Sequence, residues 1–307
     1  MGNFTRSFLK IIPSIRESTL ETIAKNPLKG QKMLIPTREG TVEVFLHSST
    51  KEYAPVVFEF HGGGFVLGDA RKDDNLREVI KDALDINVVG VNYRKAPEYP
   101  YPAAVEDAYD VIKYFYENAS NLHVDKEHFI TLGFSAGATL ATIMAILSSK
   151  KKEFQLAGQV LHYPYLDAVT DPKTKEHHPQ DLPEEVMEAF IELYSGNVDL
   201  KEVTVSPIYA TKEQLSKIAK AALFMASEDA LCLEGILYAK QLEKAGVEVF
   251  EKVIPHTYHG YMEDLFNRPC YDELPEDTKK LHASNIDIIA NESMHETIEV
   301  LRNMCFE

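Results

Sequence analysis

The sequence predicts an α/β fold in which a mostly parallel sheet of roughly eight strands carries helices on both faces. Two observations lead to this prediction. Strand-like runs alternate with helical stretches between residues 55 and 254, which is typical of parallel strands joined by crossover helices. Several of these runs, such as 87–91, are short and continuous, as expected of strands buried on both faces. A length of 307 residues, 45% of them hydrophobic, suits one large domain.

The individual elements are expected in a simple order along the chain. Residues 1–30 are expected to be helical with a break at Pro13, because apolar residues cluster on one side of the stretch. A hairpin should follow, with strands at 32–36 and 42–47. The remaining strands are expected at 55–60, 87–92, 128–133, 158–162, 221–226 and 247–254, and the main helices at 72–84, 103–118, 136–149 and 232–245.

One long insert interrupts the alternation of strands and helices. It lies between the expected strands at 158–162 and 221–226, and it includes a polar stretch and a helical stretch at 184–194. A structureless insert of this size is unusual within a compact domain, and long inserts commonly form lids. We therefore expect a single domain, 1–307, with cap elements at 1–30 and 168–210. Ordinary crossover connections are the alternative for the insert.

Two glycine-rich motifs each follow a strand-like run directly. The first is His61-Gly62-Gly63-Gly64-Phe65, and the second is Gly133-Phe134-Ser135-Ala136-Gly137, which leads into the helical stretch 138–148. A strand, a Gly-x-Ser-x-Gly turn and a helix are the context of a nucleophilic serine. An HGGG loop upstream usually supplies the other half of an oxyanion hole. Together, the two motifs predict acyl transfer at a serine.

Ser135 is the expected nucleophile of this chemistry. A serine hydroxyl is a weak nucleophile, so it needs a base and donors for the developing oxyanion. The N–H groups of Gly63, Gly64 and Ala136 are the expected donors, since glycine lets the backbone approach a ligand closely. His61 is expected to orient the glycine loop rather than to act as the base. A plain strand–helix junction and a flexible glycine turn are the structural alternatives.

The base is expected downstream of the serine, where histidines are few. His259 is preferred because it stands in His259-Gly260-Tyr261, shortly after the strand-like run 247–254. His256 is the competitor and could instead belong to the strand end. His282 and His295 are expected on the surface of a helical tail, and a structural histidine is the default interpretation of each.

The acid is expected directly after the strand at 221–226. Asp229 is the preferred residue and Glu228 the alternative. The carboxylate would hold the imidazole in the correct tautomer and stabilise the imidazolium without taking the proton itself. Asp229 could also cap the following helix, and the two roles are compatible.

These motifs and several others give the chain a family resemblance. The others are Asn92–Pro97, Tyr101–Ala104 with Asp107, Tyr163-Pro164 with Asp167, and Asp229–Leu231 with Glu234-Gly235. From about residue 30 to 265, the chain resembles a hormone-sensitive-lipase-type esterase of the α/β-hydrolase superfamily.

The resemblance implies an α/β-hydrolase fold with a cap and an ester substrate of modest acyl length. It implies a triad of Ser135, Asp229 and His259, oxyanion donors at Gly63, Gly64 and Ala136, and a supporting role for Asp107. No cofactor is implied, and homodimers are frequent among proteins of this kind.

The elbow and the acid loop depart from the usual family pattern. Phe134 and Ala138 replace an acidic residue and a glycine, and the run after Asp229 is Ala-Leu-Cys-Leu. These changes leave the chemistry intact but bear on the substrate. A carbohydrate-acetyl esterase or an amidase with the same triad is the alternative. A non-catalytic ligand receptor is disfavoured, because such receptors commonly lose the histidine that is present here.

The composition limits the kinds of binding partner and the cellular compartment that are expected. A net charge of −16 argues against nucleic-acid binding. No apolar stretch is long enough to span a membrane, so no stable membrane insertion is expected, and Phe4, Phe8 and Ile12 are expected to pack in the cap. Three widely spaced cysteines favour a reducing cytoplasm. Glu176-His177-His178 lacks a second set of spaced ligands, so no metal site is expected.

Overall fold

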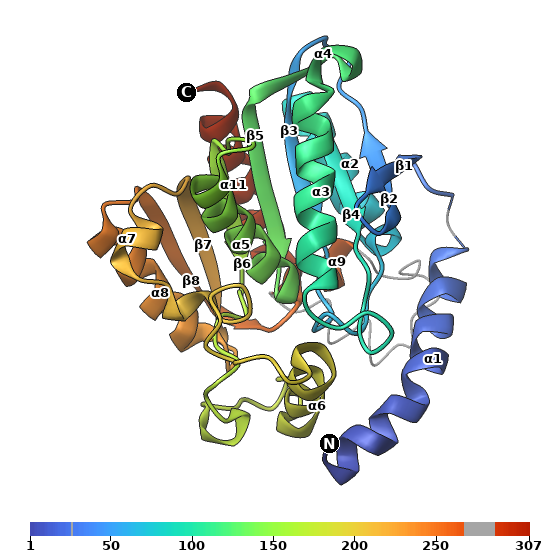
Figure 1. Cartoon of the computed structure of the whole chain (residues 1–307), viewed down its shortest axis with the longest axis vertical. Coiled ribbons are helices and arrows are strands. Elements are labelled where there is room, and N and C mark those ends of the chain that lie inside the picture. The colour runs from blue at the N-terminus through green and yellow to red at the C-terminus, as the bar shows by residue number, and fades with distance from the viewer. Residues whose placement is uncertain (26, 267–285) are drawn as a thin grey trace.

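The computed structural model describes residues 1–25, 27–266 and 286–307, and its centre is an eight-stranded sheet (Figure 1). The strand order is β1-β2-β4-β3-β5-β6-β7-β8. The strands are β1 (Gln31–Thr37), β2 (Gly40–His47), β3 (Ala54–Phe60), β4 (Asn87–Asn92), β5 (Val124–Phe134), β6 (Gly158–His162), β7 (Lys220–Glu228) and β8 (Val249–Tyr258). The predicted α/β-hydrolase fold is confirmed.

The first two strands run antiparallel to their neighbours, and all later pairs are parallel. β1 and β2 form the expected hairpin, and β2 pairs antiparallel with β4. From β4 onward each strand pairs in parallel through β3, β5, β6 and β7 to β8. Parallel strands end at the same edge of a sheet, so the residues that follow β3, β5, β7 and β8 gather there.

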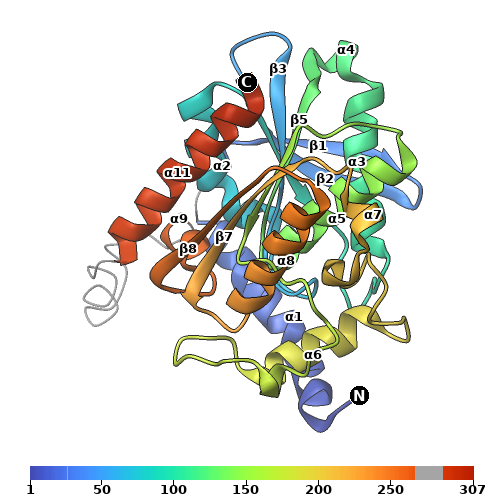
Figure 2. The same ribbon diagram turned by 90° about the vertical axis from the view of Figure 1, so that its left-hand side faces the viewer.

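Helices cover both faces of the sheet, as the alternating elements predict (Figure 2). One face carries α3 (Ala103–Glu117), α5 (Ala136–Lys151) and α8 (Cys232–Ala245), and the other carries α2 (Asp74–Leu84) and α11 (Ile286–Phe306). Alternate residues of β3 divide between the two faces: Val56, Phe58 and Phe60 lie in one core and Val57 in the other. Short helices complete the chain at α4 (Ala119–Leu122), α7 (Lys212–Leu215) and α9 (Tyr261–Phe266).

The N-terminal segment is one helix, α1 (Asn3–Ile23), so the predicted break at Pro13 is wrong. Pro13 is exposed, whereas Phe8 and Ile12 on the other side of the helix are buried. A proline removes one backbone hydrogen bond, and solvent can satisfy the freed carbonyl on an exposed side. The packing of the apolar side therefore outweighs the local cost of the proline.

The insert between β6 and β7 contains α6 (Glu184–Ser195) and the short 3-10 turns η2 (Pro172–Thr174) and η3 (Pro207–Tyr209). α6 packs against α1, and the rings of Phe8 and Phe190 meet edge to face at 5.8 Å between centroids. In Figure 1 both helices lie beyond the end of the sheet toward which the arrow of β5 points. No helix in the described residues is long and apolar enough to cross a membrane.

Candidate active site

Ser135 occupies the sharp turn between β5 and α5. Its backbone has φ of 53°, a left-handed conformation that is rare for a residue with a side chain, and its N–H donates to the carbonyl of His162 at 3.0 Å. Its carbonyl accepts from the N–H groups of Ala138 and Thr139 in the first turn of α5. This strained turn lifts the serine hydroxyl above the end of the sheet, as a nucleophile elbow requires.

The glycines on either side of the turn are required by close packing. A Cβ on Gly133 would overlap the backbone of Gly137, and a Cβ on Gly137 would overlap the carbonyl of Phe60 at the end of β3. The turn can therefore press against β3 only because both positions lack a side chain.

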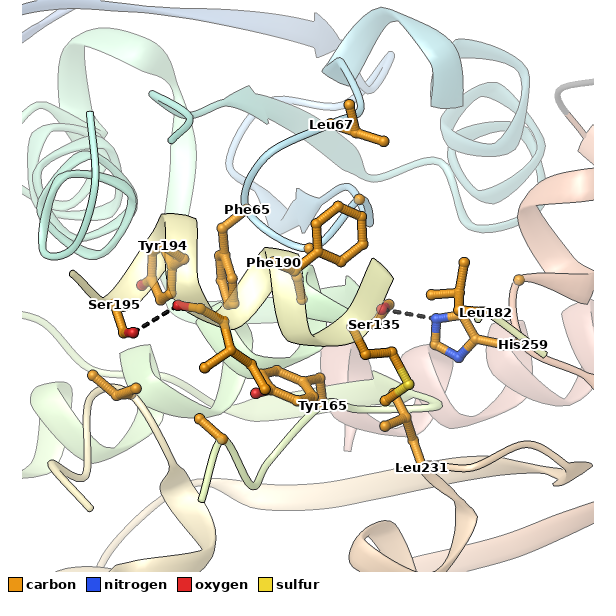
Figure 3. Close-up of a pocket in the computed structure, with 18 of the residues that line it drawn as sticks. Phe65, Leu67, Ser135, Tyr165, Leu182, Phe190, Tyr194, Ser195, Leu231 and His259 are labelled. Atoms are coloured by element: carbon orange, nitrogen blue, oxygen red, sulfur yellow. Dashed lines mark hydrogen bonds between the residues drawn. The ribbon is translucent and has the colours of Figure 1, made fainter. Parts of the chain in front are cut away.

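His259 and Asp229 meet Ser135 from the ends of β8 and β7. Nε2 of His259 lies 2.9 Å from Oγ of Ser135, and Nδ1 of His259 lies 2.9 Å from Oδ2 of Asp229. The other oxygen of Asp229 accepts the N–H of Leu231 at 2.9 Å, which fixes the carboxylate in its loop. Figure 3 shows the hydrogen bond that joins the serine and the imidazole at the side of a pocket. The structure thus brings the three residues together in a continuous chain of hydrogen bonds.

The surroundings of His259 favour its charged form. Burial alone would lower the pKa of the imidazole, but the charge and hydrogen bond of Asp229 oppose it, with smaller contributions from Glu263 and Asp181. Together they raise the pKa to about 8. An imidazole with this pKa accepts a proton readily, and the carboxylate of Asp229 stabilises the resulting imidazolium.

The two alternative residues lie together, away from the serine. The side chain of His256 is 84% exposed and that of Glu228 is 45% exposed, and Nδ1 of His256 lies 3.7 Å from a carboxylate oxygen of Glu228. They form a surface pair, whereas the side chains of His259 and Asp229 are only 10% and 2% exposed. Of the remaining histidines, His295 lies on the exposed side of α11, and His282 lies outside the described residues.

The glycine loop after β3 borders the same pocket as Ser135. Gly63 and Gly64 have φ of 115° and 61°, and the carbonyl of Gly63 accepts the N–H groups of Val66 and Leu67. Within the described residues, the N–H groups of Gly63, Gly64 and Ala136 donate to no other part of the chain. All three residues line the pocket beside the serine, so their N–H groups are available to a ligand.

His61 supports this loop as a neutral side chain. Its ring stacks on Tyr93 with 4.3 Å between centroids, and the Tyr93 hydroxyl donates to the His61 carbonyl at 2.8 Å. Nδ1 of His61 lies 2.7 Å from the carbonyl of Gly62. Burial, reinforced by the charge of Lys95, lowers the pKa of His61 to about 3, so the ring is uncharged at neutral pH.

Asp107 holds the neighbouring loop rather than the elbow. The carboxylate is fully buried on α3 and accepts from both the backbone N–H and the guanidinium of Arg94, at 2.8 to 3.0 Å. Two residues farther on, the N–H of Ala96 donates to the carbonyl of Phe65 at the end of the glycine loop. Asp107 therefore acts on the glycine loop through the segment 94–96.

The pocket in front of Ser135 has a volume of about 200 Å³ and is mostly apolar. Phe65 and Leu67 line it from the glycine loop, and Tyr165 borders it after β6 (Figure 3). The insert supplies the remaining apolar wall, with Leu182, Met187, Phe190, Ile191 and Tyr194. Such a cavity suits an apolar chain whose reactive end lies at the serine.

Two buried carboxylates near the site were not predicted from the sequence. Glu263 of α9 lines the pocket, and Asp181 of the insert accepts the N–H of Ala230, the residue after Asp229, at 3.1 Å. Neither belongs to a motif, so no local signal marks them.

His177 lies within hydrogen-bond distance of the carbonyl of Pro172, and the described residues hold no group of three His, Cys, Asp or Glu side chains that could bind a metal ion.

The comparisons with known proteins identify the class to which this fold and site belong. A model of the α/β-hydrolase fold family matches residues 57–263, so the chain belongs to that family. The predicted resemblance to esterases of this superfamily is also confirmed, and the protein is a carboxylic-ester hydrolase.

Individual relatives are similar over most of the chain. The carboxylesterase NlhH of Mycobacterium tuberculosis is 31% identical over 72% of this chain and 70% of its own. An ethyl acetate hydrolase of Pseudomonas putida is 32% identical over 74% of each chain. A crystallised esterase of Pyrobaculum calidifontis superposes with a TM-score of 0.80 at 28% identity, covering 97% of this chain and 93% of its own.

Proposed function

We propose that the protein hydrolyses esters of short to medium acyl chains through an acyl-enzyme formed on Ser135. The observation that carries the proposal is the chain of hydrogen bonds from Asp229 through His259 to Ser135 at the mouth of an apolar pocket. His259 takes the hydroxyl proton as Ser135 attacks the ester carbonyl. The protonated imidazole then returns that proton to the departing alcohol.

The developing oxyanion is held by the backbone in this proposal. The N–H groups of Gly63, Gly64 and Ala136 border the serine and are free to donate to it. In the second half of the reaction, His259 activates water against the acyl-enzyme and the acid leaves. Asp229 keeps its negative charge throughout and holds the imidazole in place.

We also propose that residues 1–30 and 168–210 form a cap that shapes the acyl site. α6 supplies most of the apolar wall opposite the serine, and α1 packs on α6. The apolar lining supports an acyl chain over a sugar as the bound group, and thus favours a carboxylesterase over a carbohydrate-acetyl esterase. A cytoplasmic location, a homodimeric state and the lack of affinity for nucleic acid remain predictions from the sequence.

The substitution Ser135→Ala tests the proposal. With p-nitrophenyl butanoate, kcat/KM should fall by at least about 10³-fold while the circular dichroism spectrum stays that of the wild type. The wild type, but not the variant, should be labelled by a fluorophosphonate. Turnover near the wild-type rate in the variant would rule out Ser135 as the nucleophile. Matched ester and amide substrates would separate an esterase from an amidase.

A further inference from the structure

Glu263 is a buried carboxylate in the active-site pocket that the proposed triad does not use. It lies in α9, four residues after His259, and only 8% of it is exposed. It borders the pocket together with Ser135 and His259. A carboxylate is costly to bury unless neighbouring groups stabilise it, so its contacts indicate what it does.

Both carboxylate oxygens of Glu263 contact residues of the active site. One accepts a hydrogen bond of 2.5 Å from the hydroxyl of Tyr163. The other lies so close to Gly62 that a Cβ at that position would be 2.7 Å away. The same Cβ would be 3.6 Å from Cβ of Ser135, so Gly62 lies between the carboxylate and the serine. Glu263 thus contacts the glycine loop on one side and Tyr163 on the other.

Tyr163 transmits this contact to the catalytic imidazole. It follows β6 with φ of 35°, an unusual backbone for a fully buried tyrosine, and its N–H donates to the carbonyl of Phe224. Its ring meets that of His259 edge to face, with 5.2 Å between centroids. The hydrogen bond to Glu263 therefore fixes a ring that packs directly against the proposed base.

Lys72 and His259 are two basic groups near Glu263 that favour its charged form. Burial and the negative charge of Asp73 raise the pKa of Glu263 to about 7, while Lys72, Tyr163 and His259 oppose the rise. Glu59 and Asp264 are further acidic groups in the same surroundings. The charge of Glu263 in turn contributes to the raised pKa of His259. An imidazolium at His259 and a carboxylate at Glu263 therefore stabilise each other.

We propose that Glu263 is a positioning residue of the hydrolysis, which fixes Tyr163 and Gly62 beside Ser135 and stabilises the imidazolium form of His259. The inference rests on the proposed roles of Ser135 and His259. The serine proton still moves to Nε2 of His259 and on to the leaving alcohol, and Glu263 neither takes nor gives a proton in the reaction.

The substitution Glu263→Gln isolates the charge, because glutamine keeps the shape and an oxygen that accepts from Tyr163. Loss of the charge should lower the pKa of His259. The acidic limb of the kcat/KM profile should then move to lower pH by on the order of half a unit or more. The plateau kcat should fall about tenfold with little change in KM. Asp264→Asn, on the exposed side of the same helix, is the matched control and should leave both quantities unchanged.

A second variant serves if Glu263→Gln does not fold. Tyr163→Phe removes the hydrogen bond that stabilises the carboxylate, so the acidic limb should move in the same direction by a smaller amount. The pH dependence of fluorophosphonate labelling reports the same shift without turnover. An acidic limb and a kcat equal to the wild type in these variants would overturn the inference. Failure of the proposed triad would show separately, as turnover by Ser135→Ala.

Discussion

Phe190 is expected to set the longest acyl chain that the pocket accepts. Its ring packs on Gly64 so closely that a Cβ there would overlap it, and the N-terminal helix supports it from behind through Phe8. The pocket has a volume of about 200 Å³. We expect it to take the acyl part of a butanoyl or hexanoyl ester and to exclude that of a decanoyl ester. Figure 3 shows Phe190 among the residues that line the pocket.

The expected effect of Phe190→Ala follows from the burial of methylene groups. Each buried methylene contributes about 0.8 kcal/mol, which corresponds to about a fourfold gain in kcat/KM. In the wild type this gain should stop near hexanoyl, where Phe190 blocks the pocket. In the variant it should continue for about two more methylenes, so the octanoyl-to-butanoyl ratio of kcat/KM should rise about 16-fold.

A series of p-nitrophenyl esters from acetyl to decanoyl measures this ratio. The acetyl ester has no methylene groups that could enter the space opened by the variant, so its kcat/KM should change least. Phe4→Ala is the matched control, because Phe4 stacks on Phe8 but does not line the pocket. A folded Phe190→Ala enzyme with the octanoyl-to-butanoyl ratio of the wild type would refute the assignment of this wall.

Two further predictions concern the scaffold of the site. Gly137→Ala should abolish activity and lower the free energy of unfolding by about 3 kcal/mol or more, because its Cβ overlaps the rigid carbonyl of Phe60. Gly246 has φ of 88° and open space around it, so Gly246→Ala should lower the free energy of unfolding by only about 1 kcal/mol and keep full activity. Urea unfolding measures both variants, and equal losses would refute the steric argument. Burial lowers the pKa of His162 to about 3, below its unfolded value of 6.5. The stability carried by its neutral form is therefore present above pH 6.5 and is lost as the pH falls toward 3. Between pH 6.5 and 5, the free energy of unfolding of His162→Phe should therefore fall by about 2 kcal/mol less than that of the wild type, as measured by urea titration. An equal fall in both proteins would contradict this.

The central motif of the site could be predicted because local chemistry determines it. A strained serine turn needs glycines where Gly133 and Gly137 stand, and it needs a strand before and a helix after, so the requirement is written in consecutive residues. The sequence distinguishes Asp229 from Glu228 less clearly, since both follow the same apolar run. β7 continues through Glu228, which points outward, and Asp229 is the first residue beyond the strand, where the chain turns toward the site.

The break expected at Pro13 shows where local propensity misleads. A proline in a helix interior costs stability in isolation, and the sequence offers no sign of what the helix packs against. In the structure, Phe8 and Ile12 are buried on one side of α1 while Pro13 faces solvent. Tertiary packing stabilises the helix, and the residues next to Pro13 in the sequence carry no information about that packing.

Glu263 marks the limit of what such a sequence can reveal. By itself it is an acidic residue at the start of a short helix, where the helix dipole favours acids and solvent exposure is the usual outcome. Its contacts, Gly62 and Tyr163, lie about 200 and 100 residues earlier in the chain. Only the parallel order of the sheet brings the ends of β3, β6 and β8 to one edge and buries the carboxylate between them. Its effect on His259 is therefore a property of the folded sheet, and substitution of Glu263 tests the electrostatics of the assembled site rather than those of any local motif.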